Sequence, residues 1–519
     1  MVFRFFNFLR TEKRRPSESG NCYGVFQANF PVDRSKVFLE LENGEQYSFN
    51  DLERISGRFM HLLENLGIQS GDRIVVDVGK SAEALFFYIA CLRFGVVYVP
   101  IRPQMPVAEV EYILKDIAPA LVVCQPADEV KFSKLTQALE IKHMRTLGLR
   151  SDGSLMEESV FLPPRSDTIP VPPDSVACIL YTSGTTGQQK GVMLTYKNLI
   201  ANAEALQQIF PFRSNEILLH TLSLYHLTGL LTSINHALYA GIKIILLARV
   251  TPDTIAKFLP RATIFIAAPA TYASLLELSD ANDSSWQSVR FAFCATAPLH
   301  RDLADRFRKH TGRTIVDRYG MSEAMTMAAN SIGERSGSVG KAVPSVNIRI
   351  TDEYGRKLKP GEVGNIEIEG PQVFKGYWND EQKTKESFRA DGFFITGDLG
   401  KLDSDGYLSL SGRAKDVIVT ASGGNIYPQE VERHLNAIEG IEDSVVFGVP
   451  HLTLGEYPIA LLKKNDHASG LDAKLIISKL KQSISAYKLP KKFLFVDEIP
   501  KSQAGKISRK LLSERYKNL

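Results

Sequence analysis

Tyr181-Thr-Ser-Gly-Thr-Thr-Gly-Gln-Gln-Lys-Gly-Val192 is the stretch of this sequence that indicates most about its fold. Such a Ser/Thr/Gly-rich loop with one lysine, Lys190, is suited to bind phosphate. Its hydroxyls and unhindered backbone N–H groups can surround phosphate oxygens, and the lysine adds a compact positive charge. Residues 175–180 predict a strand before the loop and residues 198–209 a helix after it, so we expect the loop at a strand exit, where α/β proteins bind nucleotides.

Other phosphate-binding motifs do not match this loop. The glycine-to-lysine spacing differs from that of a Walker A motif, and Lys190 is followed by Gly191 rather than by Ser or Thr. A dinucleotide fingerprint is also missing. The alternative is a flexible interdomain linker, which would require neither the flanking strand and helix nor the lysine.

Length and composition describe an ordinary globular chain. Its 519 residues predict two to four domains or subdomains. The apolar content of 44% and the charged content of 23% are typical of soluble proteins. A net charge of +4 over this length gives no reason to expect a nucleic-acid partner.

The cysteines indicate a reducing compartment. They are odd in number, widely spaced and mostly within apolar segments, so we expect buried thiols, no disulfides and no metal site in a cytoplasmic protein. The histidines show no ligand spacing either. The cysteines are Cys22, Cys91, Cys124, Cys178 and Cys294.

Two segments raise the question of membranes. The apolar run 84–100 contains Arg93 and Gly95, which predicts a buried helix followed by a buried strand rather than a transmembrane segment. Residues 2–15 mix aromatic and basic residues without the apolar core of a signal peptide. A weak peripheral contact with acidic lipid and a frayed or docked terminal helix are the two interpretations of this terminus.

Helix and strand signals alternate along the first four hundred residues. This alternation predicts a mostly parallel sheet with helices on its faces. From about residue 346, short strands with frequent glycine predict a smaller antiparallel or barrel-like section, and residues 411–416 separate it from a final mixed segment. The ranges expected as helices are 49–66, 81–94 and 107–117, and those expected as strands are 73–77, 96–101, 121–124, 347–351, 364–369 and 407–410.

Several motifs in order resemble the acyl-adenylate-forming superfamily, which includes acyl-CoA synthetases, peptide synthetase adenylation domains and firefly luciferase. The resemblance implies an α/β fold: a large N-terminal AMP-binding domain (1–412) of parallel α/β subdomains with a small β-barrel-like section, and a small mobile α+β C-terminal lid (413–519). The motifs are 181–192, Tyr225-His226, Arg318-Tyr-Gly-Met-Ser-Glu323, Thr396-Gly-Asp-Leu399, Gly412-Arg-Ala-Lys-Asp416, Gly423-Gly-Asn-Ile-Tyr-Pro428 and Pro500-Lys-Ser-Gln-Ala-Gly-Lys506.

The resemblance implies a two-step ligase that uses ATP, Mg²⁺ and coenzyme A. A carboxylate is a poor electrophile, so it first attacks the α-phosphate of ATP to give an acyl-AMP, which a thiol then attacks. Charge accumulates on phosphate in the first step. Catalysis therefore consists mainly of positioning and of charge neutralisation by cations and backbone donors.

The resemblance assigns roles to four charged residues. Glu323 is expected to bind Mg²⁺, Asp398 and Arg413 to contact the ribose, and Lys506 to reach the α-phosphate and the acyl oxygen. Without the resemblance, Glu323 would be read as a surface glutamate, Asp398 as a turn residue, Arg413 as a strand-end charge and Lys506 as a solvated lysine.

The remaining assignments follow the same resemblance. His226 and Thr185 join Lys506 and Glu323 as catalytic residues, and Lys415 is the hinge about which the lid turns from adenylation to thiol transfer. The loop 420–425 is one residue longer than the common version. The residues expected to bind ATP or CoA are Thr182, Ser183, Gly184, Thr186, Gly187, Lys190, Ala295, Thr296, Ala297, Tyr319, Gly320, Met321, Ser322, Asp398, Arg413, Lys415, Gly423, Gly424 and Asn425.

The expected acid pocket is largely apolar and adaptable, which favours a fatty or other apolar acid. Malonate is the alternative, because residues 80–93 and 371–407 look closest to malonyl-CoA synthetases. That subgroup commonly carries a second histidine where this chain has Thr228. The residues expected around the pocket are Leu224, His226, Leu227, Thr228, Met321, Ala324, Met325 and Met327.

Malonate would need a cation in the pocket, since an unpaired buried charge is heavily penalised. Arg290, Arg301 and Arg306 lie near suitable segments, but the sequence does not place any of them in the pocket.

Two other functions are weighed beside a CoA ligase. An acyl-AMP ligase that loads the phosphopantetheine of an acyl carrier protein would use the same residues. A non-enzymatic acyl-nucleotide sensor is disfavoured, because such a protein has no physical need to keep Lys190, Glu323, Asp398, Arg413 and Lys506 together.

Overall fold

The structure is a computed structural model in which the described part of the chain forms two compact units. The first unit comprises residues 1–334, 343–346 and 370–386, and the second comprises 335–342, 347–369 and 387–519. The domain boundary at residues 412 and 413 stays a prediction. The described residues are 20–183, 189–278, 283–295, 299, 301–331, 337–419, 425–451, 455–465, 468, 471–501 and 507–517.

One seven-stranded sheet of the first unit is parallel except at its edge strand β2. Its core strands are short and apolar, as expected of strands buried on both faces. In spatial order they are β13 (Ile315–Val316), β12 (Phe291–Cys294), β11 (Ile264–Ala267), β9 (Ile217–His220), β10 (Lys243–Leu246), β1 (Val37–Leu41) and β2 (Gln46–Ser48).

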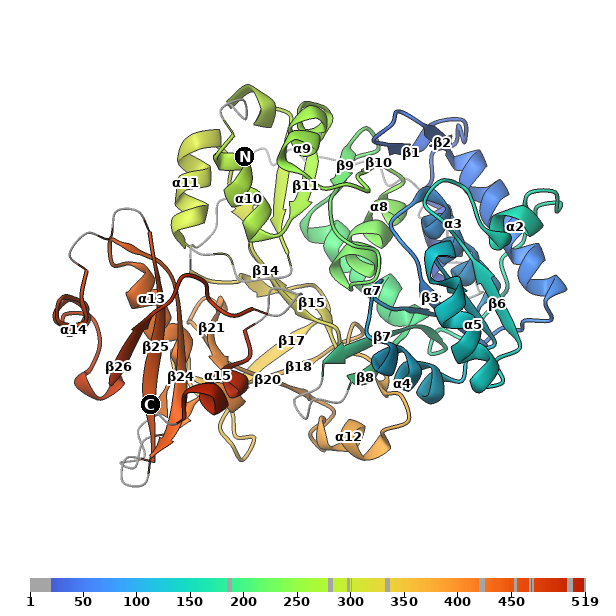
Figure 1. Ribbon diagram of the computed structural model, residues 1–519. Coiled ribbons are helices and arrows are strands. Elements are labelled where there is room, and N and C mark those ends of the chain that lie inside the picture. The colour runs from blue at the N-terminus through green and yellow to red at the C-terminus, as the bar shows by residue number, and fades with distance from the viewer. Residues whose placement is uncertain are drawn as a thin grey trace, which may run out of the picture. The chain divides into compact units, whose positions relative to one another are not determined.

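Helices cover both faces of this sheet, and one group forms a continuous apolar core with it. Phe265 and Ala267 of β11 pack in a cluster with residues of α9 (Pro252–Phe258), α10 (Pro269–Leu276) and α11 (Arg301–Thr311), which Figure 1 shows beside β11. Strand residues alternate between the two faces, so Ile264 and Ile266 point away from this cluster.

The second seven-stranded sheet of this unit contains the predicted phosphate loop. Its central strands are parallel, whereas β8 and β19 are antiparallel additions. In spatial order its strands are β19 (Gly376–Tyr377), β8 (Gln189–Thr195), β7 (Val176–Ser183), β4 (Val97–Pro100), β3 (Arg73–Asp77), β5 (Leu121–Cys124) and β6 (His143–Thr146).

The predicted helices of the first unit are present, and their bounds differ from those expected by two residues at most. Capping explains where two of them begin: Ser48 caps α2 and Thr195 caps α7, each within a capping box. Besides α9, α10 and α11, the α-helices described in this unit are α1 (Cys22–Gln27), α2 (Phe49–Asn65), α3 (Ala82–Phe94), α4 (Val107–Ile117), α5 (Glu129–Ala138), α6 (Ser154–Ser159), α7 (Tyr196–Ile209), α8 (Asn235–Ala240) and α12 (Glu381–Glu386).

The sequence missed strand β8. It predicted a phosphate loop between a strand and a helix, but β8 lies between them and pairs with β7 as a hairpin. Gly191 and the polar start of β8 hid a strand that is defined by its pairing with β7 and β19.

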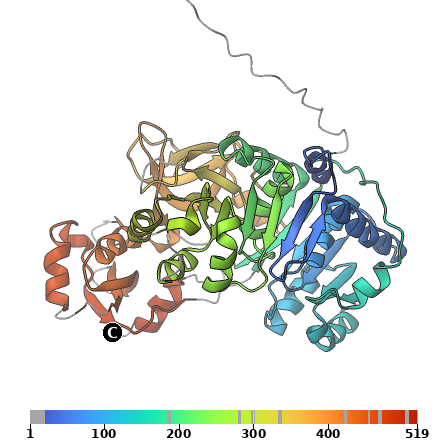
Figure 2. The same ribbon diagram turned by 90° about the horizontal axis from the view of Figure 1, so that it is seen from above.

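The second unit is built around antiparallel strands, and the strands expected at 347–351 and 364–369 have those bounds. Its four-stranded sheet is β17 (Asn347–Thr351), β18 (Gly364–Glu369), β20 (Phe394–Leu402) and β21 (Leu408–Arg413). The later part of the unit contains β22 (Ile418–Val419), β23 (Asn425–Ile426), β24 (Ile441–His451), β25 (Gly455–Lys464), β26 (Lys492–Phe495), α13 (Pro428–Asn436), α14 (Ala473–Leu480) and α15 (Arg509–Tyr516). Figure 2 shows both units from a second direction.

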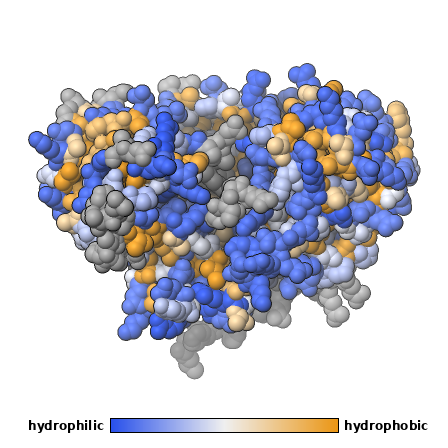
Figure 3. Space-filling view, turned by 60° about the horizontal axis from the view of Figure 1, so that its bottom comes forward, coloured by the Kyte–Doolittle hydropathy of each residue, from blue (hydrophilic) through white to orange (hydrophobic). Residues whose placement is uncertain are grey.

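The expected burial of the cysteines and the expected helix and strand of the apolar run are confirmed. All five cysteines are buried free thiols. The run 84–100 forms the buried helix α3 and strand β4. Within the described ranges, the structure contains no helix whose length and apolarity would suffice to span a membrane. On the face in Figure 3, hydrophilic side chains predominate and apolar ones are interspersed among them. The basic aromatic segment 2–15 lies outside the described residues.

Arg93 is a buried charge that stabilises α3 against its neighbours. Its side chain is 1% exposed and donates to the carbonyl of Glu53 (2.9 Å), Ser56 Oγ (2.7 Å) and the carbonyls of Arg165 (2.9 Å) and Asp167 (3.0 Å). Five donors in a planar fork suit such a set of acceptors.

We expect Arg93→Met to lower the free energy of unfolding by about 3 kcal/mol, because buried acceptors lose their donors. Urea unfolding followed by tryptophan fluorescence checks this, since both tryptophans, Trp286 and Trp378, lie in the first unit. The control is Arg54→Met, which removes an exposed ion pair and should change the free energy by less than about 1 kcal/mol. Equal effects of both substitutions would contradict the role of Arg93.

Candidate active site

The hairpin of β7 and β8 fixes the position of Lys190 in the first unit. Thr182 pairs with Lys190 and Ser183 pairs with Gln189 across the two strands. Lys190 is therefore a strand residue at the base of the phosphate loop, and its Nζ lies 5.4 Å from the centroid of the Tyr377 ring. The predicted loop residues Gly184, Thr185, Thr186 and Gly187 lie outside the described residues.

Tyr377 connects Lys190 with Glu323. It belongs to β19, where it pairs with Val192 of β8. Its hydroxyl donates to Glu323 Oε1 at 3.1 Å, and the Phe374 amide donates to the Glu323 carbonyl at 2.8 Å. Tyr377 thus contacts both Lys190 of the β7–β8 hairpin and the carboxylate of Glu323, which belongs to a motif far away in the chain.

A tight hairpin of β14 (Arg318–Met321) and β15 (Met325–Ala329) presents the motif that precedes Glu323. Gly320 must be a glycine, because a Cβ there would lie 2.3 Å from the Met325 carbonyl oxygen. Met325 itself has a φ of 52°, which is strained for a residue with a long side chain. Tyr319 is buried, whereas Met321 and Ser322 are partly exposed at the turn.

The segment 295–297, which was expected to bind ATP or CoA, begins where β12 ends. Ala295 is buried, and its amide donates to the Ala267 carbonyl at 3.1 Å. The structure therefore places Ala295 at the carboxyl end of a parallel strand, the edge at which α/β sheets bind ligands. Thr296 and Ala297 lie outside the described residues.

In the second unit, Asp398 and Arg413 form an ion pair across β20 and β21. Arg413 Nε lies 2.8 Å from Asp398 Oδ1, and the two residues are direct partners in the strand register. The Asp398 amide donates to Thr396 Oγ1 at 3.1 Å. Because Asp398 is 7% exposed and Gly397 has a φ of 72°, the carboxylate is held at a sharp bend rather than on a freely moving turn.

The expected hinge and thiol-transfer residues belong to the same unit. Lys415 lies in a short 3₁₀ turn (Ala414–Asp416). Arg509, the first residue of α15, contacts Asp416 Oδ2 at 3.3 Å and donates to Glu432 Oε1 at 2.6 Å. This helix therefore contacts the turn that contains Lys415. Asn425 begins β23, and Gly423, Gly424 and Lys506 lie outside the described residues.

Glu323 does not belong to a metal cage. Among the residues that the structure describes, no group of three or more His, Cys, Asp or Glu side chains could hold a metal ion. A single carboxylate is compatible with Mg²⁺, which usually binds through one or two carboxylates together with the phosphates of its nucleotide.

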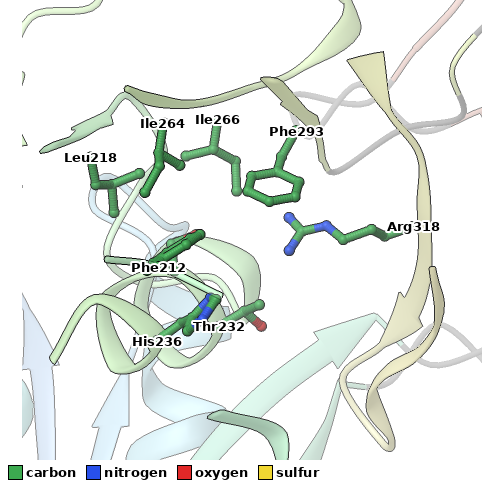
Figure 4. Close-up of a pocket in the computed structure, with 9 residues that line it drawn as sticks. Phe212, Leu218, Thr232, His236, Ile264, Ile266, Phe293 and Arg318 are labelled. Atoms are coloured by element: carbon green, nitrogen blue, oxygen red, sulfur yellow. The ribbon is translucent and has the colours of Figure 1, made fainter. Parts of the chain in front are cut away.

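A cavity in the first unit lies between the sheet and the helical segment after His226. Its non-atom space of about 240 Å³ includes open solvent, so only a small part of it is enclosed. One wall includes η2 (Thr228–Ile234), a π-helical turn of the kind that often occurs at functional sites. The lining residues, most of them labelled in Figure 4, are Phe212, Leu218, Thr232, Ser233, His236, Ile264, Ile266, Phe293 and Arg318.

The three arginines weighed from the sequence do not line this cavity. Arg290 pairs with Glu216, while Arg301 and Arg306 have side chains that are 80% and 57% exposed on α11. Arg318 lines it instead. His226 is exposed in the loop before η2, and the residues expected around the acid pocket are not among those that line this cavity.

Two residues of interest were not singled out from the sequence. Tyr377 stands in the segment 371–407, which was compared as a whole, and Arg318 was quoted only as the first residue of the motif that ends at Glu323. An arginine that precedes a buried tyrosine in a short strand was the available signal for a charge near the pocket. Its orientation depends on how β14 packs.

Comparison with known families and proteins agrees with this geometry. Residues 26–378 match the AMP-binding enzyme family, and residues 430–506 match the AMP-binding enzyme C-terminal domain. A long-chain-fatty-acid–CoA ligase of Bacillus subtilis is 31% identical over 95% of this chain and 93% of its own length. The mitochondrial malonate–CoA ligase ACSF3 of Mus musculus is 30% identical over 81% of this chain and 78% of its own length.

Solved structures share the fold over nearly the whole chain. ATP-bound MatB from Rhodopseudomonas palustris superposes with a TM-score of 0.92 at 35% identity, covering 96% of this chain and 99% of that one. The o-succinylbenzoate CoA synthetase MenE of Bacillus subtilis, in complex with its acyl-adenylate intermediate, has a TM-score of 0.82 at 26% identity and covers 94% of this chain and 97% of its own. The chain thus belongs to the AMP-binding enzyme family, and it is an AMP-forming acyl-CoA ligase.

Proposed function

We propose that this protein joins a carboxylic acid to coenzyme A in two half-reactions, using ATP and releasing pyrophosphate and AMP. The observation that carries the proposal is the contact of Lys190 and Glu323 with one tyrosine, Tyr377. A phosphate-binding lysine and a metal-binding carboxylate must act on the same triphosphate, and their common partner supports that use. The direct test is pyrophosphate release across a panel of acids, with hydroxylamine trapping of the acyl-AMP.

In the first half-reaction the acid carboxylate attacks the α-phosphate and pyrophosphate leaves. Lys190 and the hydroxyls of the loop would hold the phosphates, and Lys506 would approach the α-phosphate and the acyl oxygen as negative charge accumulates. Asp398 and Arg413 would hold the ribose, since a carboxylate can accept hydrogen bonds from both hydroxyls of a vicinal diol. These groups act by positioning and charge neutralisation, which are the main contributions in phosphoryl chemistry.

Mg²⁺ would enter with ATP and would neutralise part of the phosphate charge. Glu323 is the residue that would hold it, and Tyr377 would keep the Glu323 carboxylate in one orientation through the 3.1 Å hydrogen bond. This tyrosine is a positioning residue, because it acts through another side chain.

In the second half-reaction a thiol attacks the acyl carbon and AMP leaves. The proposal assigns the turn at Lys415 as the hinge, and the segment from Gly423 to Asn425 as the part of the lid that then faces the thiol. Delivery to the phosphopantetheine of an acyl carrier protein is the alternative second step, and competition between CoA and a carrier protein distinguishes the two.

Two classes of acid are candidates. An apolar acid is supported by the adaptable residues expected around the pocket and by the long-chain-fatty-acid–CoA ligase among the relatives. Malonate is supported by the relative named as a malonate–CoA ligase. The two place opposite demands on the pocket, since the first needs apolar walls alone and the second also needs a cation.

We expect Lys506→Ala to slow acid-dependent pyrophosphate release by on the order of 10²-fold or more, because a cation that stabilises the developing charge is lost. Thiol transfer from synthetic acyl-AMP should persist, since it does not need this lysine. Lys510→Ala, at an exposed position in α15, is the matched control. Unchanged pyrophosphate release in Lys506→Ala would refute the assignment.

Asp398→Asn should raise the KM for ATP by about tenfold or more, because a hydrogen bond to a charged group is worth about 1.5–3 kcal/mol. Steady-state kinetics with varied ATP measures it. Asp391→Asn changes an exposed carboxylate in the same unit that pairs with Arg349, and it should leave the KM for ATP unchanged. If both variants bind ATP equally well, the ribose assignment is wrong.

Tyr377→Phe should raise the Mg²⁺ concentration for half-maximal activity by about three- to tenfold, which corresponds to losing one hydrogen bond of about 1 kcal/mol. A Mg²⁺ titration of pyrophosphate release at saturating ATP measures this. Tyr354→Phe alters an exposed tyrosine and serves as the control. A Mg²⁺ requirement that does not move would show that Tyr377 does not position Glu323.

A further inference from the structure

Arg318 projects into the cavity of the first unit, and no residue in the described part of the chain forms an ion pair with it. Its guanidinium lies over the Phe293 ring, 4.5 Å from the centroid, and Figure 4 shows it directed at the space between Phe293 and Thr232. Within the described part of the chain, no hydrogen bond or ion pair of this guanidinium is found. Its backbone amide, in contrast, donates to Asp317 Oδ1 at 2.9 Å.

This guanidinium remains charged although it is desolvated. Burial lowers the pKa of Arg318 to about 10, so the side chain is protonated at neutral pH. The carboxylate of the adjacent residue, Asp317, has its pKa raised by burial to about 6 and forms no ion pair with Arg318 among the described residues. A positive charge in apolar surroundings is costly unless an anion approaches it.

The neighbouring histidine, His236, is neutral and adds no second positive charge beside Arg318. His236 stacks on Phe212 with ring centroids 3.7 Å apart, and its Nε2 lies 2.9 Å from Gln207 Oε1. Because the amide oxygen is an acceptor, Nε2 carries the proton. Burial lowers the pKa of His236 to about 3, with Arg318 contributing, so the ring is neutral at neutral pH.

The other polar side chains that line the cavity are the hydroxyls of Ser233 and Thr232. Ser233 Oγ already donates to the Thr228 carbonyl at 2.6 Å. Thr232 is 3% exposed, and no hydrogen bond of its hydroxyl is found among the described residues. Figure 4 shows this hydroxyl on the Arg318 side of the cavity. One fork of N–H donors and one hydroxyl, surrounded by apolar walls, match a single carboxylate.

The chain position of Arg318 links this cation to the reacting end of the acid. Arg318 opens β14, and Met321 closes it, just before the turn that carries Glu323. Three residues of strand span about 10 Å, and the arginine side chain covers part of that distance. An acid whose reacting carboxylate lies at the turn therefore needs only a few carbons for a second carboxylate to reach the guanidinium.

We infer that Arg318, assisted by Thr232, binds a second carboxylate of the acid, so that the preferred substrate is a short dicarboxylic acid. This inference rests on the proposed function. A plain fatty chain in the same cavity would leave the guanidinium desolvated and unpaired, and the site would therefore discriminate against it. Sites built to pair a polar group commonly reject analogues that lack it by large factors.

The first experiment compares the full-length enzyme on matched acids. Rates of ATP-dependent pyrophosphate release give kcat/KM for malonate, succinate and glutarate against propionate, butyrate and pentanoate. We expect one dicarboxylate to exceed its matched monocarboxylate by about 100-fold or more. A wild-type preference for the monocarboxylates would overturn the inference and leave the ligase function standing. No pyrophosphate release with any acid would instead refute the proposed function.

The second experiment assigns the preference to Arg318. Arg318→Met should lower kcat/KM for the preferred dicarboxylate by about 100-fold and should leave or raise that for the monocarboxylate. Arg318→Lys keeps the charge and the fold but loses the bidentate geometry, so an intermediate loss is expected. The control Arg290→Met removes another arginine that lies over a phenylalanine, Phe291, but that is already paired with Glu216. It should not change the preference.

Binding without turnover provides an independent readout. Millimolar dicarboxylate should stabilise the wild-type enzyme against thermal unfolding and should not stabilise Arg318→Met, because a ligand that binds only the folded state raises its stability. Equal stabilisation of both proteins, or an unchanged substrate preference in both Arg318 variants, would overturn the inference.

Discussion

The first unit depends on the antiparallel pairing of β8 with both β7 and β19. The pairing with β7 places Lys190 opposite Thr182, at the base of the phosphate loop. The pairing with β19 places Tyr377 opposite Val192, from where its hydroxyl reaches Glu323. Segments that are nearly two hundred residues apart in the chain thus meet through backbone hydrogen bonds of one strand. Without β8, no strand would join the segments that carry Lys190 and Tyr377, and Tyr377 would not contact both Lys190 and Glu323.

Three charged sites of the molecule differ in how their charges are paired. Arg93 is buried and donates to four acceptors, so it stabilises the fold. Asp398 and Arg413 form an ion pair across two adjacent strands, where the Arg413 side chain is partly exposed. Arg318 is partly buried, and no ion pair of its guanidinium is found among the described residues. Each of these charges is partly removed from solvent. Whether such a charge stabilises the fold or is available to bind a ligand depends on the partner that it has within the protein.

Much of the fold could be predicted from the sequence. Strands such as β3 and β5 and helices such as α2 and α4 followed from local apolar patterns, and the structure confirms them. The family also followed from motifs that are local in the chain. Strand β8 did not, because its glycine and polar residues give no strand pattern and its two neighbours are remote. The roles of the predicted site residues remain proposals, and several of those residues lie outside the described ranges.

The sequence by itself determined the order of the motifs, the family and the burial of the cysteines, because each of these depends on residue type and local spacing. Only the tertiary structure decided that Tyr377 contacts both Lys190 and Glu323, and that Arg318 rather than Arg290, Arg301 or Arg306 lines the cavity. The reason is physical: whether an arginine is paired, exposed or buried facing a cavity depends on which elements pack around it, and that packing joins segments far apart in the chain.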